Sequence, residues 1–458
     1  MDQNNTRESF ISRIFYRILG FNELSSALRK LSLKYLFFLI ILSGFSLSKA
    51  WLSLWYLNFI NYYEFGLVYS AGLLVAFLLD FPLGLFADIF GRRLSYILSQ
   101  LMYCLYFLLL LVVNSFSGFL LLEIISGIGN AFGTGSFDAW YMDTWQEFET
   151  EKNQKQKIPK IGGIMSNALF IYSALVVLFI FLSGVALGDT KVIDQEIAFS
   201  IFVIQGTFQV FGILFGFFWI KDQKTTQSPE EKAFSDLKGM KKISNRIKSF
   251  LNEYFDERML IFIVVIVLVT VTDSMSFIFN SMLFSPLLNL ELGVTLLVLT
   301  SMRSTGNLVS MFTTRLSKRV VELFKNPPML YILSMFFTYP LSWLSIAVIL
   351  EYDLAIDLKV TLFFFIYLLR IFIMVLLYSA FFNLVYDYTD PQKRASQQSM
   401  RGSINSFIMM LAYFSVGTIL EQWGFINLFG AFFLISLFTV SFLYLIISRV
   451  NRKVINSL

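Results

Sequence analysis

Long apolar runs alternate with short charged segments along the whole chain, and this alternation constrains the fold more than any other feature. A bilayer has a hydrocarbon core roughly 30 Å thick, which an α-helix crosses in about 20 apolar residues. We therefore predict an all-α polytopic membrane protein, with the lipid bilayer as its surroundings. Its twelve predicted spans cover residues 35–58, 66–86, 95–113, 118–141, 161–184, 197–220, 259–283, 293–313, 328–350, 359–386, 403–421 and 425–448.

The composition argues against an enzyme. Of the 458 residues only 15% are charged, whereas soluble domains have about 25%. There is no His, so neither an imidazole metal ligand nor a His general base is available. The sequence also shows no nucleophile with a base, no cluster of metal-ligand residues and no phosphate-binding loop. We therefore predict no catalytic activity, no cofactor and no metal.

The Lys and Arg residues predict the orientation, because short loops rich in them stay in the cytoplasm. With the N-terminus inside, nearly all basic clusters fall on one side, whereas the outer loops are acidic. The inner clusters are Arg29/Lys30/Lys34, Arg92/Arg93, Lys152 to Lys160, Lys221 to Arg258, Arg315 to Lys325, Lys393 to Arg401 and Arg449 to Lys453. Both termini are thus predicted to be cytoplasmic. Topology accounts for the net charge of +5, so no nucleic-acid partner is expected.

A polar, basic stretch divides the spans into two groups of six. We expect a cytoplasmic amphipathic segment at 1–34, a six-helix bundle at 35–220, a cytoplasmic linker at 221–258, a second six-helix bundle at 259–448 and a tail at 449–458. Two six-helix halves are typical of secondary transporters built from repeats, with the substrate site at mid-bilayer between the halves. We expect a monomer in the cytoplasmic (inner) membrane that binds a small-molecule substrate and protons.

A charged loop between the second and third predicted spans carries a motif. Gly84, Asp88, Gly91, Arg92 and Arg93 match the pattern G-x-x-x-D-x-x-G-R-[RK]. Gly84 is expected to let neighbouring backbones approach, and Gly91 to permit a turn with positive φ. The carboxylate and the two guanidinium groups can hydrogen-bond to one another and to helix ends.

This loop is the signature of the major facilitator superfamily, which the chain resembles over its whole architecture. The resemblance implies a twelve-helix transporter with alternating access, in which the loop latches the two halves on the cytoplasmic side. It implies a gating role for the five motif residues, and we add Asp138 and Asp143 at the inner end of span four.

A narrower resemblance points to bacterial efflux-type members. The sequence looks like this group at Asp80-Phe-Pro82 and at Gly135 to Asp143. It departs from the drug/proton exchangers in two places. Span five lacks their Gly-Pro signature, and Glu123 stands where they commonly have a functional Arg.

Ionisable side chains deep in spans cost about 2.5 to 3.5 kcal/mol each, so they usually face a cavity or a partner. They are Lys49, Asp80, Glu123, Asp138, Asp273, Arg303 and Arg370. Lys49 and Asp273 lie at equivalent depths in corresponding spans of the two halves. They form either a substrate or proton site that opens and closes with the transport cycle, or a fixed buried ion pair.

The remaining charges leave several roles open. Without His, proton coupling requires carboxylates, and Glu123, Asp80 and Asp138 are candidates. Glu123 could also be a solvated charge at the outer rim, and Asp138 could instead serve the cytoplasmic gate. Arg303 and Arg370 are permanently charged, and either bind an anionic group of the substrate or neutralise Asp273. The aromatic residues Trp51, Trp55 and Tyr56 are expected to form an interfacial belt.

These features favour proton-coupled export of an amphipathic or lipophilic small molecule. One alternative is uptake or facilitated transport of an organic anion, suggested by the two buried arginines. Others are a lipid or peptide translocator for envelope biogenesis, and a receptor with a transporter fold that does not transport.

Overall fold

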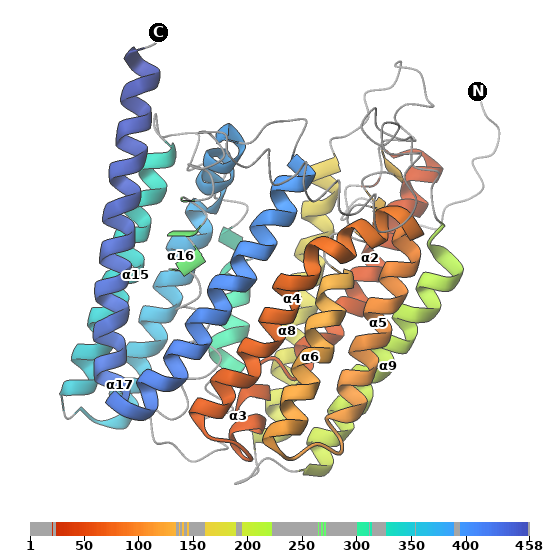
Figure 1. Ribbon diagram of the computed structural model, residues 1–458, viewed down its shortest axis with the longest axis horizontal. Helices are drawn as coiled ribbons and strands as arrows, with labels where there is room; N and C mark the ends of the chain where they lie inside the picture. Colours follow the sequence, from red (N-terminus) through yellow and green to blue (C-terminus); the bar gives the residue numbers. More distant parts are fainter. Residues whose placement is uncertain are drawn as a thin grey trace.

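The computed structural model is an assembly of long helices that run side by side (Figure 1). It describes residues 21, 24–133, 137, 140, 141, 144, 145, 161–188, 195–221, 264, 267, 268, 270, 271, 300–310, 312, 313, 327–352, 354–388 and 394–456. Every regular element within these residues is helical, so the predicted all-α class is confirmed for the described part.

The N-terminal half forms one bundle. Its elements are α2 (Ser26–Ser43), η1 (Gly44–Leu47), α3 (Leu52–Leu57), α4 (Tyr62–Phe90), α5 (Arg92–Leu109), α6 (Phe116–Gly133), α8 (Ile161–Gly188) and α9 (Gln195–Trp219). In this bundle α4 packs on α6, α5 packs on α6 and α9, and α2 packs on α8 and α9.

The C-terminal half contributes the helical residues 300–310, α15 (Pro327–Glu351), α16 (Ile356–Tyr388) and α17 (Arg394–Asn456). Helix α17 consists of two arms, because Gly424 adopts a φ of 75° and a ψ of 178°. Figure 1 shows both arms rising from this turn at the bottom of the view, so the chain runs in opposite directions along them. The turn falls between the spans predicted at 403–421 and 425–448.

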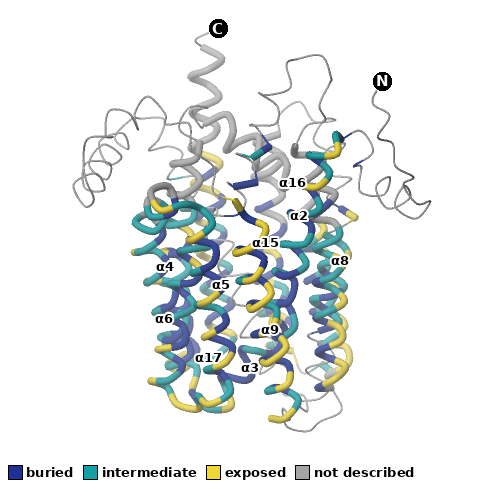
Figure 2. The backbone as a smooth tube through the Cα atoms, turned by 90° about the vertical axis from the view of Figure 1, so that its right-hand side faces the viewer, coloured by how far each residue is buried: buried dark blue, intermediate teal, exposed yellow. Residues whose placement is uncertain are grey.

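The helices have the length and apolar surface that a bilayer requires. Among the described residues, 5 stretches are long and apolar enough to cross a membrane: Ser26–Leu57, Tyr62–Asp80, Phe116–Gly133, Gln195–Trp219 and Gly402–Leu445. Large apolar side chains such as Phe218, Phe365 and Phe438 are exposed on them and on α16. Figure 2 shows exposed positions along the lengths of α8 and α15. The chain is therefore a multi-pass membrane protein; the total of twelve spans stays a prediction.

The first span is not a continuous helix. It begins at Ser26, nearer the N-terminus than predicted, where the Ser25 hydroxyl accepts a hydrogen bond from the backbone N–H of Leu28. It breaks after Ser43, passes through the 3₁₀ turn η1 and resumes as α3. The Gln205 side-chain amide of α9 donates to the carbonyls of Gly44 and Phe45, at 3.2 and 3.1 Å. A side chain from another helix thus partners backbone groups that the break releases.

The two halves meet most closely along α4 and the first arm of α17. We call this contact the α4/α17 seam. A Cβ added to Gly66 would lie 2.7 Å from the Tyr413 carbonyl oxygen, and one added to Gly417 would lie 2.9 Å from the Tyr62 carbonyl oxygen. The Ser70 hydroxyl donates to the Met410 carbonyl at 2.9 Å. Small residues thus bring the two backbones into contact, as is common between helices in membranes.

Candidate solute site between the two halves

The break in the first span places Lys49 at the boundary between the halves. Lys49 is exposed, although Ser48, Ala50 and Trp51 beside it are buried. The Arg303 guanidinium, from the second half, donates a hydrogen bond to the Lys49 carbonyl. The structure records no hydrogen bond or ion pair of the Lys49 ammonium with any described residue. The Lys49 ammonium also interacts electrostatically with the Arg303 guanidinium, so two cations lie together between the halves.

Tyrosine side chains from both halves surround this pair. Arg303 interacts electrostatically with Tyr69 of α4, Tyr367 of α16 and Tyr413 of α17. The rings of Tyr69 and Tyr413 stack across the seam with centroids 5.2 Å apart. Tyr69 also hydrogen-bonds through its hydroxyl to the side chain of Ser53 in α3. The site thus combines positive charge with aromatic faces and hydroxyl groups.

Arg370 lies inside the second half. It is buried, and its guanidinium carbon is 5.1 Å from the centre of the Trp343 ring of α15 and 5.9 Å from that of Tyr367. A guanidinium over an aromatic face is a favourable packing arrangement. The electrostatic surroundings of Tyr367 include both Arg370 and Arg303.

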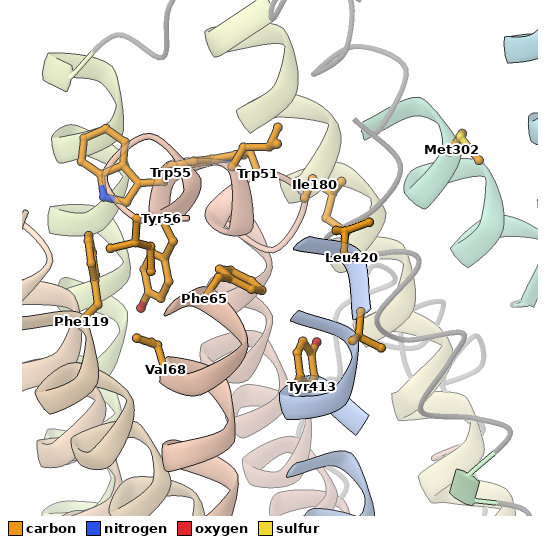
Figure 3. Packing of buried hydrophobic residues seen from close by; sticks show 14 of the residues in the cluster. Trp51, Trp55, Tyr56, Phe65, Val68, Phe119, Ile180, Met302, Tyr413 and Leu420 are labelled. Atoms are coloured by element: carbon orange, nitrogen blue, oxygen red, sulfur yellow. The ribbon is translucent and has the colours of Figure 1, made fainter. Parts of the chain in front are cut away.

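Glu123 is buried within the N-terminal bundle. Its Oε1 accepts from the hydroxyls of Tyr56 at 3.0 Å and Tyr106 at 3.3 Å, and these hydroxyls lie 2.9 Å from each other. Gly72 of α4 packs against the same residue, because a Cβ there would lie 2.7 Å from the Glu123 carbonyl oxygen. A solvated position at the outer rim does not fit this burial. Figure 3 shows Tyr56 beside Phe119 of α6, with Tyr413 of α17 near Phe65.

Asp80 lies farther along the α4/α17 seam and is buried there. A Cβ added to Gly402 of α17 would lie 3.6 Å from the Asp80 Oδ2. Beside the seam is an apolar cavity of about 490 Å³, whose lining includes Phe77, Val271, Phe407, Leu411, Phe432 and Ile435. The seam therefore carries both a buried carboxyl group and space for an apolar group.

The two glycines of the motif loop differ in how their surroundings compare with the prediction. Gly91 ends α4 with a φ of 102°, as the motif predicted. Around Gly84 no described atom lies within 4 Å of an added Cβ, so the described residues show no close backbone approach there, and the expectation for Gly84 stays a prediction. Arg92 begins α5, and Arg93 donates to the Phe217 carbonyl at the end of α9, at 2.7 Å. A cation at a helix C-terminus is favoured by the helix dipole.

Several candidates named from the sequence lie outside the described residues. These are Asp138, Asp143, Asp273 and the side chain of Asp88. The predicted pairing of Lys49 with Asp273 and the gating role of the acidic residues therefore remain predictions.

The sequence-based analysis missed the tyrosines that join these charges. Tyr69 and Tyr106 were not singled out, and Tyr56 was expected in an interfacial belt. Instead Tyr56, Trp51 and Trp55 are buried in the core, with at most 2% of each side chain exposed. The nearest signal was the concentration of aromatic residues at the end of span one, which fits packing as well as it fits a membrane interface.

Comparisons with known proteins agree with this architecture. The family model of the Major Facilitator Superfamily matches residues 36–366, which is more than half of the chain. A search of curated proteins finds no match.

The fold is similar to solved structures of several transporters. The nucleoside transporter NupG aligns with a TM-score of 0.63 and 14% identity, covering 91% of this chain and 98% of that one. An auto-inhibited peptide transporter of the POT family aligns at 0.66 and 12%, covering 92% and 97%. The inward-open xylose transporter XylE from E. coli aligns at 0.62 and 10%, covering 91% and 95%. At these identities the likeness shows the fold, and together with the family match it means that the chain belongs to the Major Facilitator Superfamily.

Proposed function

We propose that this protein is a secondary transporter that moves a small organic anion by alternating access. The observation that carries the proposal is the meeting of Lys49 and Arg303 between the two halves. The Lys49 ammonium has no anionic partner among the described residues. A cation at this depth is costly unless it faces water or a partner. An anionic solute supplies such a partner.

The contact crosses the boundary at which the halves must separate. Alternating access needs interactions that exist in one state and not in the other. A solute anion that binds both cations would bridge the halves, and the aromatic faces of Tyr69 and Tyr413 could hold its organic part. The similar solved structures are those of a nucleoside, a peptide and a xylose transporter, so the fold by itself does not identify the solute.

Thermal unfolding of the purified protein with a panel of compounds tests this proposal. The panel contains aliphatic and aromatic carboxylates, phosphate esters, neutral sugars and amphipathic cations. A ligand that binds only the folded protein raises the unfolding temperature. We expect an anionic class to do so, and Lys49→Gln to weaken its binding about tenfold or more, which corresponds to about 1.4 kcal/mol.

The matched control is Lys359→Gln, which removes a lysine near the start of α16, away from the contact between Lys49 and Arg303. It should leave binding unchanged. Stabilisation by neutral or cationic compounds alone, or equal effects of the two substitutions, would overturn the assignment of an anion.

A second candidate is proton-coupled export of an amphipathic compound, which the apolar cavity beside the seam favours. In that case amphipathic members of the panel should stabilise the protein. Phe407→Ala should reduce this stabilisation, because it removes an aromatic ring that lines the cavity, whereas Lys49→Gln should not. Uptake of the same compounds into inverted vesicles under an imposed pH gradient would then measure the direction and the coupling.

A further inference from the structure

Three oxygen atoms form a closed triangle in the N-terminal bundle. They are the Glu123 Oε1, the Tyr56 hydroxyl and the Tyr106 hydroxyl, with edges of 3.0, 3.3 and 2.9 Å. They come from three different helices, α6, α3 and α5. Each edge is within or near the usual length of a hydrogen bond between oxygens. The arrangement is therefore a hydrogen-bonded ring.

Counting protons shows what the ring lacks. Three edges need three protons, and the two phenols supply one each. An ionised carboxylate supplies none, so one edge would bring two acceptors together. A carboxyl group protonated on Oε1 supplies the third proton and donates it along one of the two edges that reach Oε1, so that this edge reverses its direction and each oxygen then donates once and accepts once.

The surroundings of Glu123 favour the same neutral form. The titratable side chains that face it are Tyr56 from α3, Tyr69 from α4, and Tyr103 and Tyr106 from α5. No described cation forms an ion pair with it. Burying a carboxylate without a cation costs several kcal/mol, and a bound proton removes this cost.

We propose that Glu123 holds the coupling proton of this transporter, in a ring closed by the hydroxyls of Tyr56 and Tyr106. This inference rests on the proposed function and names the second species that the carrier moves. On binding, a proton from water joins the Glu123 carboxylate to give the neutral acid. On release, the O–H bond breaks and the proton returns to water, leaving the carboxylate.

Tyr69 connects the ring to the solute site. It interacts electrostatically with Glu123 on one side and with Arg303 on the other, and its ring is 5.8 Å from that of Tyr56. A solute anion at Lys49 and Arg303 repels a second negative charge on Glu123. The anion therefore favours the protonated carboxyl, and by linkage the proton favours the anion. A monovalent anion and one proton together add no net charge to the carrier.

Infrared difference spectroscopy of the purified protein in nanodiscs tests the ring without any solute. A buried protonated carboxyl group gives a C=O stretching band that disappears when alkaline buffer removes its proton. We expect a band of the wild type that is absent in Glu123→Gln; any band of the other buried carboxyl group, Asp80, should remain in both proteins. Tyr56→Phe and Tyr106→Phe each remove two edges of the ring, one of which reaches Glu123, so each should shift the band and the pH at which it disappears. Tyr96→Phe, on the same helix as Tyr106 but without an electrostatic interaction with Glu123, should change neither.

Each outcome decides the inference. A spectrum that loses no band in Glu123→Gln, or a Glu123 band that ignores both ring substitutions, overturns it. If Glu123→Gln does not fold, the two phenylalanine variants give the answer by themselves. Should the band be missing while anions still stabilise the protein in a Lys49-dependent way, the proton site fails and the proposed function stands. The reverse pattern would retain the proton site and refute anion transport.

Discussion

Replacing Gly66 with alanine should force the α4/α17 seam apart. The added Cβ would lie 2.7 Å from the Tyr413 carbonyl oxygen, whereas ordinary contacts begin at 3.4 Å. The difference, 3.4 minus 2.7, requires a shift of 0.7 Å. A backbone atom cannot give way as a side chain does, so the helices must separate. Overpacking of this kind costs about 1 to 3 kcal/mol.

The cost applies only to the state in which the seam is closed. If the transport cycle opens the seam, the same 1 to 3 kcal/mol shifts the population about 5- to 150-fold towards the open state. The seam contact at Gly66 lies in the predicted outer half of α4. The assay uses Lys49→Cys in a Cys104→Ser background and a membrane-impermeant thiol reagent added from outside. The introduced cysteine should react about 5- to 150-fold faster when Gly66→Ala is also present than when it is not.

Gly430→Ala is the matched control, because an added Cβ at Gly430, in the second arm of α17, meets no described atom within 4 Å. It should leave the reaction rate unchanged. An unchanged rate in Gly66→Ala, or an equal rise in both variants, would mean that the seam does not close the outer path.

Three further substitutions test how the framework is held. Gln205→Leu removes the donor to two carbonyls at the break in the first span. We expect it to destabilise the protein by about 1 to 3 kcal/mol in thermal unfolding. An unchanged stability would show that these carbonyls need no side-chain donor. Gly91→Ala places a Cβ at a φ of 102°, so it should cost about 1 to 2 kcal/mol by the same measurement, and Gly84→Ala, with open space around it, should cost less. Arg93→Gln should lose about 0.3 to 2 kcal/mol by removing a cation from the end of α9, with the loss shrinking as salt is added; a loss that ignores salt would count against the dipole explanation.

Hydropathy predicted the all-α membrane architecture because lipid requires apolar residues over a fixed length in every span. The orientation, which was inferred from the basic loops, stays a prediction. The motif similarly predicted the turn at Gly91, since a positive φ selects glycine in any context. Span boundaries were less accurate. Ser25, which caps α2, precedes the first apolar run and was assigned to the N-terminal segment.

The site was predictable only in its charges. Lys49 and Arg303 stand out because charged residues are rare in spans. Their contact, however, depends on the break in the first span, which its apolar sequence does not predict. The ring around Glu123 depends on tyrosines from two further helices. With 21 tyrosines in the chain, no local pattern separates those that pack from those that bind. Such choices follow from which helices become neighbours.

The turn at Gly424 has a mechanical consequence. Because a single residue joins the two arms of α17, neither arm can slide far along its axis without pulling the other. Any displacement that the first arm undergoes against α4 is thus transmitted as a push on the final helix, which ends at Asn456. A fluorophore attached at the end of α17 would therefore move when the first arm shifts against α4, and its signal could follow turnover in real time.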